Sequence, residues 1–521
     1  MAWLWLVALA LVTTVLLVLY IRLNDQRLTR IPEGALAVSP TRCTPEYARL
    51  VAAKVEKSPI SISDQIPPRT GRRYIVVGGA GFLGGWIVMQ LLERGEDPRR
   101  IRILDIRAPV RHDLTTRGKD VAFIQTDVSD AAAVDAAFNA PWPDQNMPGP
   151  PPEITVFHTA ANIRFYEKSE MLLPNSAKVN VTGTQNILNA SQAVGATIMV
   201  YTSSGSVSVH ATRFLLWPWE TEPAFFVQPI DEDEALIPKR HADHFSNYAA
   251  TKMQAERHVR AADRSASRDS VLRTGCIRPG NGVFGSGGDM LCGAYLVRKV
   301  NPTWMNSIVQ NFVYVENCAV AHLLYEQRLL DLANGSKNPD IGGETFVIAD
   351  PGPPPTYGDV YLLLSTLDGE TTFPTVSPTL MLLISYLISS YYLSRSWLLA
   401  AGYSIAHKLP NLTSDIVNLQ PSLFNLVNVH LIFNDSRARL PPEKGGLGYK
   451  GAWTTYEGLH KTVVEHKLGA MRSEQRSASA GIGMGFSSWG SGLVKAQKGI
   501  EDVSEKISDK IGVDPVQVLS S

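Results

Sequence analysis

The chain has 521 residues, which is long enough for two or three domains with cores of their own. Hydrophobic residues make up 45% and charged residues 19%, and the mean hydropathy is −0.03, which excludes a wholly disordered chain and a polytopic membrane protein. Lys plus Arg and Asp plus Glu both number 49, so the composition gives no electrostatic reason to expect a nucleic-acid partner. The four cysteines are scattered, which argues against a disulfide scaffold and predicts a reducing compartment.

An apolar segment opens the chain. Residues 1–21 carry no charged side chain, and about 20 helical residues span the ~30 Å hydrocarbon core of a bilayer. A cleaved signal peptide is the alternative, but the basic start and the small-residue cleavage site that it requires are not evident. We therefore expect a transmembrane anchor over residues 1–22. Arg22, Arg27 and Arg30 follow it and nothing basic precedes it, so the positive-inside rule predicts that the next domain is cytosolic.

The rest of the chain divides by its pattern of apolar residues. Residues 23–71 are proline-rich and of mixed polarity, and we expect a linker there. Apolar β-type runs then alternate with helical patterns, which predicts an α/β fold with a doubly wound parallel sheet of the Rossmann type over residues 72–275. The Ser-, Gly- and Lys-rich residues 468–521 predict a mobile tail with one weak amphipathic helix. The expected strands are residues 73–77, 101–105, 121–125, 154–157 and 197–201.

A glycine-rich turn after the first strand predicts a dinucleotide site. Its spacing is G-x-x-G-x-x-G, and glycine lets the backbone approach a pyrophosphate at the N-terminus of the next helix. Asp105 ends the second strand, where a carboxylate binds the adenosine ribose and disfavours NADP, although Arg107 would tolerate it. Asp127 and Val128 end the third strand near the expected adenine site, with a turn-capping aspartate as the alternative. NAD is the expected cofactor, with NADP left open. The residues of the turn expected to contact it are Gly78, Gly81, Phe82, Leu83 and Gly84.

A tyrosine and a lysine suggest a catalytic pair. Tyr248 and Lys252 lie at i and i+4, on one face of a predicted helix, and a nearby ammonium favours the phenolate that removes a proton from a hydroxyl. A chain with 17 tyrosines contains about one such pair by chance, so a surface cation–π pair is the alternative. Ser204 follows the fifth strand, where its hydroxyl can orient the substrate oxygen. No carboxylate–histidine cluster has metal spacing, so we expect no metal site.

In this order, the motifs resemble the extended short-chain dehydrogenase/reductases, specifically the 3β-hydroxysteroid dehydrogenase family, which includes sterol-4α-carboxylate 3-dehydrogenases. The resemblance implies Ser204, Tyr248 and Lys252 as the catalytic residues, with Ser203 as a less favoured substitute for Ser204. It also implies that Ala160 and Pro279 line the nicotinamide site, and that Asn180 supports it. It extends over residues 72–467 and also rests on segments 156–161, 180–184, 201–204, 277–279, 312–317 and 433–439.

The resemblance further implies NAD(P)-dependent oxidation of the 3β-hydroxyl of a steroid or sterol, in its biosynthesis. Where the substrate carries a 4-carboxyl group, CO₂ can be lost. A smaller substrate-binding region is expected over residues 276–467, and the anchor suggests the endoplasmic reticulum membrane. Two alternatives stay open: another extended reductase or epimerase acting on a lipid or sugar, and a non-catalytic NAD-binding membrane scaffold. A homodimer and an association with other enzymes of the sterol pathway also stay open.

A second apolar segment falls inside the substrate-binding region. Residues 371–394 carry no charge, yet the resemblance resumes beyond them, so a single crossing would divide the substrate region between two sides of a membrane. We therefore expect residues 371–405 to contact the membrane beside the active-site mouth without crossing it. A buried core helix is the alternative. The apolar insert at residues 215–220 is expected to belong to the same mouth.

Overall fold

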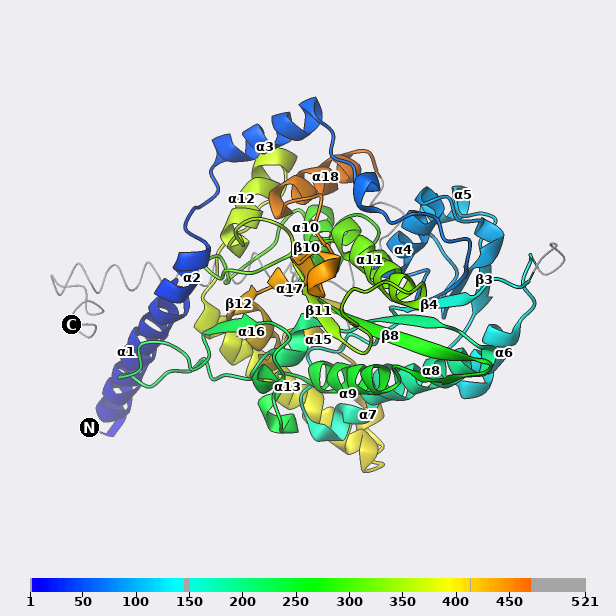
Figure 1. Ribbon diagram of the computed structural model, residues 1–521. Coiled ribbons are helices and arrows are strands. Elements are labelled where there is room, and N and C mark those ends of the chain that lie inside the picture. The colour runs from blue at the N-terminus through cyan, green and yellow to red at the C-terminus, as the bar shows by residue number, and fades with distance from the viewer. Residues whose placement is uncertain (1, 145–149, 413, 470–521) are drawn as a thin grey trace.

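A parallel sheet forms the centre of the computed structural model, which describes residues 2–144, 150–412 and 414–469. Seven strands follow the order β3-β2-β1-β4-β5-β8-β11, and the short β7 pairs antiparallel with β8 (Figure 1). All five expected strands are present, with ends that differ by no more than one residue. The strands are β1 (Arg73–Val77), β2 (Ile101–Asp105), β3 (Ala122–Gln125), β4 (Ile154–His158), β5 (Ile198–Thr202), β7 (Ser265–Ser267), β8 (Ser270–Pro279) and β11 (Thr345–Ile348).

Helices cover both faces of this sheet because its strands are apolar on both sides. Along β1, Tyr74 and Val76 pack into one hydrophobic cluster, and Ile75 and Val77 pack into the other. The strand order reverses between β1 and β4, so the carboxyl ends of these strands border the crevice in which doubly wound sheets bind ligands. The covering helices are α4 (Phe82–Glu93) and α11 (Val315–Ala333) on one face, with α6 (Ala131–Asn139), α8 (Thr184–Val194) and α9 (Asn247–Ala261) on the other.

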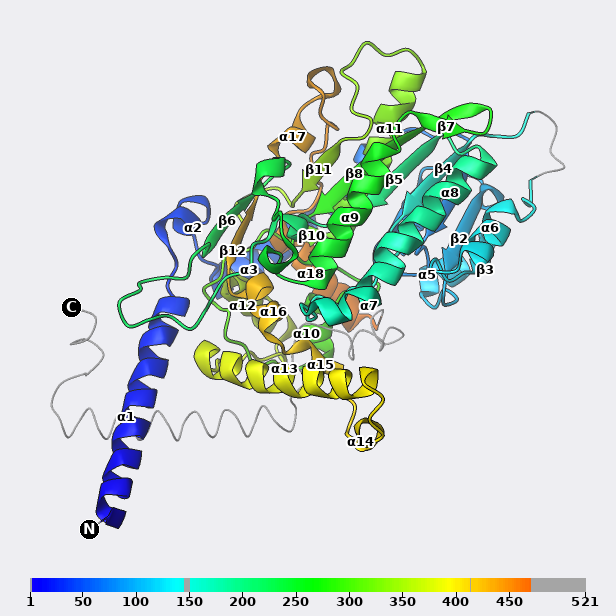
Figure 2. The ribbon, with the colours of Figure 1, turned by 90° about the horizontal axis from the view of Figure 1, so that it is seen from below.

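A smaller region borders the carboxyl ends of the strands (Figure 2). It contains two short parallel pairs, β6 (Val227–Ile230) with β12 (His430–Phe433) and β9 (Val283–Phe284) with β10 (Val313–Tyr314). The expected cut at residue 276 does not separate the two regions in space, because β11 and α11 complete the sheet layer while β6 belongs to the smaller region. Its main helices are α10 (Cys292–Arg298), α12 (Tyr357–Asp368), α13 (Pro378–Ala400), α14 (Ile405–Lys408), α16 (Pro421–Val427) and α18 (Thr455–Lys467).

The segment expected to be a linker is instead folded onto the smaller region. It continues α1 (Ala2–Leu28) and then forms α2 (Glu33–Val38) and α3 (Pro45–Lys57), and two of its prolines stand at the starts of these helices. The backbone N–H of Cys43 donates to Asp359 at 2.6 Å, and Lys54 pairs with Glu457 at 2.9 Å. The expectation of a linker over residues 23–71 is therefore wrong, because its apolar residues and polar contacts tie it to α12 and α18.

The first helix projects from the fold at the N-terminal end (Figure 1). Among the described residues, it is the one helix whose length and apolar composition suffice to cross a membrane. Its large apolar side chains between residues 3 and 17 are exposed. The tail expected over residues 468–521 lies almost wholly outside the described residues.

Candidate active site

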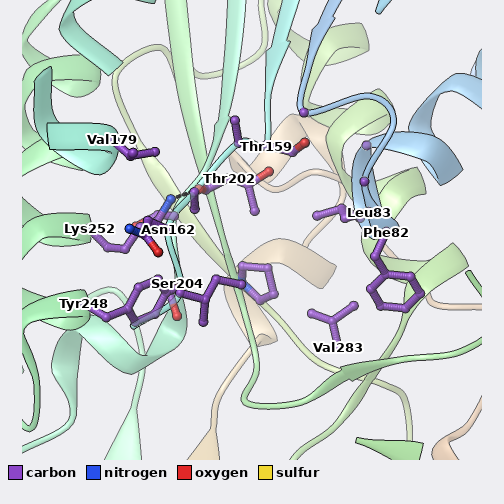
Figure 3. A pocket seen from close by; sticks show the side chains of 18 of the residues that line it. Phe82, Leu83, Thr159, Asn162, Val179, Thr202, Ser204, Tyr248, Lys252 and Val283 are labelled. Atoms are coloured by element: carbon purple, nitrogen blue, oxygen red, sulfur yellow. Dashed lines mark hydrogen bonds between the residues drawn. The ribbon is translucent and has the colours of Figure 1, made fainter. Parts of the chain in front are cut away.

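A cavity of about 650 Å³ lies at the carboxyl ends of the sheet strands and contains most of the predicted site residues. In Figure 3, Tyr248, Lys252 and Ser204 lie on one side of it, and Phe82, Leu83 and Val283 lie on the other. Of the residues predicted to bind cofactor or substrate, thirteen line the cavity: Gly78, Gly81, Phe82, Leu83, Gly84, Asp105, Asp127, Val128, Ala160, Ser204, Tyr248, Lys252 and Pro279. Arg107 and Asn180 do not line it.

The glycine turn leaves no room for side chains. A Cβ on Gly84 would lie 2.2 Å from the carbonyl oxygen of Gly78, and Gly78 itself has a φ of +82°. Gly81 caps α4 without a side-chain hydrogen bond, so the first N–H groups of this 12-residue helix stay available at the cavity wall. These features fit the pyrophosphate of a dinucleotide, whose negative charge is stabilised by a helix N-terminus.

Asp105 lies at the end of β2, next to the glycine turn. Its carboxylate accepts hydrogen bonds from the backbone N–H groups of Ala80 and Arg107, both at 3.2 Å, which fixes its position in the cavity wall. Burial raises the pKa of this carboxyl, and the same backbone donors offset part of that effect. Arg107 is exposed, and its backbone rather than its side chain contacts Asp105. This arrangement fits a ribose with free hydroxyls.

Asp127 and Val128 follow β3 and line the same end of the cavity. The Asp127 carboxylate accepts hydrogen bonds from the backbone and hydroxyl of Ser129, at 2.9 and 2.7 Å, and these bonds lower its pKa. Asp127 therefore stabilises its turn and also borders the cavity, while its contact with the adenine stays a prediction.

The three proposed catalytic side chains come from two elements. Ser204 follows β5, while Tyr248 and Lys252 lie in the first turns of α9. The Ser204 hydroxyl is 2.7 Å from that of Ser206 and also hydrogen-bonds Tyr248. Burial raises the pKa of Tyr248, and the bond with Ser204 lowers it in part.

The ammonium of Lys252 is bound to the backbone at the end of β5. Its ammonium donates to the carbonyl oxygen of Thr202 at 2.6 Å and lies 4.1 Å from the centre of the Tyr201 ring. Burial lowers the pKa of Lys252 to about 7, whereas Cys276 and Glu256 raise it. The ammonium therefore faces the end of β5 here, rather than pairing with the phenol of Tyr248 as the sequence predicted.

Ser203 has a different environment from its neighbour. Its hydroxyl donates to Glu256 at 2.6 Å, and Glu256 forms a fully buried ion pair with Arg278 at 2.7 Å. The guanidinium of Arg278 donates two hydrogen bonds to the carboxylate of Glu256, so the two charges satisfy each other in the core beneath Lys252. Because the Ser203 hydroxyl is engaged there, the geometry favours Ser204 as the hydroxyl that faces a substrate.

Asn180 lies in a π-helical turn, Lys178–Gly183, and is buried behind the cavity wall. Its side chain bonds both the backbone N–H and the carbonyl of Asn162, at 2.7 and 3.1 Å, and also Thr251 in α9 at 3.0 Å. It thus holds a lining residue against the catalytic helix. The role expected for Asn180 in supporting the nicotinamide site stays a prediction.

Sequence reasoning missed other residues that shape the cavity. Asn162 and Thr202 line it, and the Glu256–Arg278 pair supports it from below. The available signal was a charged residue near the end of a buried strand, as at Arg278 in β8. His158 is wholly buried against Thr184 at 3.0 Å, and burial lowers its pKa to about 3, as expected of a core histidine. Within the described residues, no three His, Cys, Asp or Glu side chains gather as metal ligands would.

Comparison with known proteins assigns the chain to a family. Residues 75–375 match the 3-beta hydroxysteroid dehydrogenase/isomerase family. The chain belongs to this family. This match confirms the predicted resemblance. Members of the family are NAD(P)-dependent oxidoreductases.

Curated relatives agree with the family assignment. The chain is 27% identical to 3beta-hydroxysteroid-dehydrogenase/decarboxylase isoform 1 of Arabidopsis thaliana, over 76% of this chain and 79% of that protein. It is 30% identical to 3 beta-hydroxysteroid dehydrogenase type 7 of Mus musculus, over 55% and 70%. It is 28% identical to a decarboxylating sterol-4-alpha-carboxylate 3-dehydrogenase of Candida albicans, over 54% and 70%. Among solved structures, it is similar to UDP-glucose 4-epimerase of Thermotoga maritima, with 19% identity, a TM-score of 0.49, and coverage of 76% and 99%.

Proposed function

We propose that this 3β-hydroxysteroid dehydrogenase family member oxidises the 3β-hydroxyl of a sterol or steroid with NAD, while anchored in a membrane by α1. The observation that carries the proposal is that Ser204, Tyr248 and Lys252 line the same cavity as the glycine turn and Asp105. The names of the relatives support the substrate class, since all three act on steroids or sterols.

In the proposed reaction, Tyr248 accepts the proton of the substrate hydroxyl, and Ser204 donates a hydrogen bond to the same oxygen. Because burial raises the pKa of Tyr248, its phenolate requires positive charge nearby. Lys252 supplies one cation from the next turn of α9. When bound, oxidised NAD supplies the hydride acceptor and a second positive charge. The alcohol thereby loses a hydride from carbon and a proton from oxygen, and becomes a ketone.

The residues beyond Ser204 favour an apolar substrate. Ile163, Phe165, Met290, Leu291 and Leu426 line this end of the cavity. Among the described residues that line the cavity, Lys252 is the one cationic side chain, and its ammonium is already bound to the carbonyl oxygen of Thr202. A sugar nucleotide would require cations for its own diphosphate, so the lining supports a sterol over that alternative.

A 4-carboxyl group on the substrate would add a second outcome to the same chemistry. Oxidation at C3 then produces a β-keto acid, which loses CO₂ without a further side chain. We place the catalytic region in the cytosol at the endoplasmic reticulum membrane, because three arginines follow the apolar part of α1.

The proposal is tested with purified full-length protein in lipid nanodiscs, supplied with NAD and a panel of 3β-hydroxysterols with and without a 4α-carboxyl group. Mass spectrometry of the sterol and absorbance of NADH measure the products. We expect a 3-ketosterol in equal amount to NADH, and CO₂ only from the carboxylated sterols. Turnover of a UDP-sugar with none of any sterol would overturn the assignment. The Tyr47→Phe variant changes an exposed tyrosine on α3 and serves as the matched control for Tyr248→Phe.

A further inference from the structure

The helix α13 is apolar on two opposite faces, and the described part of the chain covers only one of them. Met381 and Leu382 are 1% exposed in the core of the smaller region. On the other face, Leu387, Ser390, Ser394 and Trp397 follow the three- and four-residue spacing of a helix surface and carry no charge. Leu387 is 72% exposed and Trp397 is 56% exposed. Large uncharged apolar surfaces of this kind mark a contact with another apolar phase.

This exposed surface continues onto neighbouring elements. Trp397 packs against Tyr403 with ring centres 6.0 Å apart, and Ile405 at the start of α14 is also exposed. Near the other end of α13, Trp217 and Trp219 stack in parallel at 5.3 Å, and Trp219 is 75% exposed. Exposed tryptophan and tyrosine rings are typical of the interface between lipid and water.

The first helix fixes where a bilayer would lie. Asn24, near its C-terminal end, donates to Thr379 in the first turn of α13 at 2.8 Å and to the carbonyl of Phe214 at 3.0 Å. Arg27 donates to the carbonyl oxygens of Trp217 and Pro218 at 3.0 and 2.7 Å. The anchor is therefore hydrogen-bonded to the first turn of α13 and to the segment that carries Trp217 and Trp219, so its direction sets the orientation of both relative to a bilayer.

From these observations, we propose that the outer face of α13 and α14, with the Trp217–Trp219 pair, is a docking surface that lies in the lipid interface of the leaflet entered by α1. In both ribbon views, α13 lies on the side toward which the N-terminal end of α1 projects (Figures 1 and 2). An interfacial helix of this kind lies in the plane of the membrane, with its apolar side chains among the acyl chains.

The chain on either side of α13 stays on one side of the membrane. Lys467 in α18 donates to the carbonyl of Leu367 in α12 at 2.7 Å, so the residues before and after α13 belong to one packed unit. A crossing by α13 would break this unit. Docking in the interface covers the exposed apolar face of α13 with lipid and leaves the fold intact.

The docking surface also lies beside the cavity. Tyr392 on α13 accepts a hydrogen bond from Arg164 at 3.0 Å and donates to the buried Glu167 at 2.7 Å. Ile163, the residue before Arg164, lines the cavity and is 46% exposed. The membrane helix therefore borders the cavity mouth, which offers a sterol a direct route from the leaflet. This last step rests on the proposed function, whereas the docking itself does not.

The test measures depth in the membrane and requires no activity. All four native cysteines are buried, so a single new surface cysteine can carry a spin label. The labelled full-length variants are Leu387→Cys, Trp397→Cys and Trp219→Cys, reconstituted in phosphatidylcholine–phosphatidylserine vesicles. Val271→Cys in the β7–β8 hairpin, which lies on the far side of the molecule, is the matched control (Figure 2). Relaxation by oxygen and by a water-soluble nickel complex reports the depth of each label.

We expect the three surface labels to be relaxed more by oxygen than by nickel, and the control label to show the reverse. The proposal fails if the labels at 387 and 397 are as accessible to nickel as the label at 271. It also fails if these labels are shielded from both reagents and show dipolar broadening between copies, because a second copy of the chain would then cover the surface. A failure of sterol oxidation would leave these depths unchanged, so the two proposals can fail separately.

Discussion

Two regions border the cavity, and the chain builds them differently. We call the region around the glycine turn the nucleotide side, and the region that carries α1 and α13 the membrane side. The nucleotide side takes its glycine turn, Asp105 and Asp127 from one continuous stretch, residues 73–128, and each follows a strand end. The membrane side joins α1, the insert at residues 215–220 and α13, and more than 150 residues of sequence separate each of these segments from the next. Backbone geometry dictates the first set locally, whereas the second depends on contacts between distant segments.

A change confined to the glycine turn should weaken the binding of NAD and leave the membrane side unchanged. In Gly84→Ala the new Cβ would meet the Gly78 carbonyl at 2.2 Å and the Thr159 hydroxyl at 2.7 Å, so the turn must move away from the pyrophosphate position. We expect NAD affinity to fall by about 100-fold or more, which corresponds to about 2.7 kcal/mol. Calorimetric titration of folded protein measures it, and Gly34→Ala, where a Cβ has room, is the control. Affinity within twofold of the wild type would contradict the assigned cofactor position.

Tyr248 lies where the two sides meet, and its removal should affect chemistry alone. The Tyr248→Phe variant keeps the packed ring but loses the proton acceptor, so we expect turnover to fall by about 10²–10⁴-fold. NAD affinity should stay within a few-fold of the wild type. Steady-state kinetics and NAD titration on the same preparation separate the two quantities. Retention of a tenth of the activity would rule out Tyr248 as the base.

Cofactor preference tests the nucleotide side more finely. Asp105→Ala removes the carboxylate that disfavours a 2′-phosphate while Arg107 remains, so we expect the ratio of NAD to NADP efficiency to shift by about tenfold toward NADP. The double variant with Arg107→Ala should lose part of that gain. An unchanged ratio would mean that Asp105 serves only to hold the backbone of Ala80 and Arg107.

A buried histidine of the smaller region, His430 in β12, should add to the acid sensitivity of the fold. Its Nδ1 accepts a hydrogen bond from the backbone of Val309 at 3.0 Å, and burial lowers its pKa to about 4, although the Arg30 carbonyl opposes this. The folded state therefore binds fewer protons than the unfolded state between pH 6.5 and 4. Stability is complete above pH 6.5 and falls as the pH falls through this window, by up to about 1.4 kcal/mol per pH unit.

His430→Asn tests this effect because an amide oxygen can replace Nδ1 as the acceptor but does not titrate. Thermal unfolding of the wild type and the variant at pH 7.5 and 5.0 gives the difference. We expect the wild type to lose more stability than the variant on acidification. Equal losses would show that His430 does not contribute to the acid sensitivity.

The contrast between the two sides also explains what the sequence could predict. The strands, the glycine turn and the residues around Tyr248 were found because strand periodicity and short motifs record local geometry. The linker expected over residues 23–71 was wrong, because the prolines at its helix starts were read without the distant residues Asp359 and Glu457 that hold this segment. The position of the Lys252 ammonium was missed for the same reason, since its partner Thr202 is 50 residues away in sequence.

The insert at residues 215–220 shows the same limit. Its apolar residues predicted a place at the active-site mouth, but its attachment to α1 through Tyr20 and Asn24 has no counterpart in sequence spacing. The Glu256–Arg278 pair is a further case, because the complementary charges lie on α9 and β8 and meet only in the folded core.

Transfer of the hydrogen on C3 of the substrate tests the central claim most directly. A 3β-hydroxysterol with deuterium at C3 is incubated with NAD and the full-length protein in nanodiscs, and mass spectrometry follows the label. We predict that the deuterium appears in the reduced nicotinamide in equal amount to the 3-ketosterol, and that Tyr248→Phe abolishes both. Deuterium that remains on every sterol, in protein that binds NAD normally, would contradict the account.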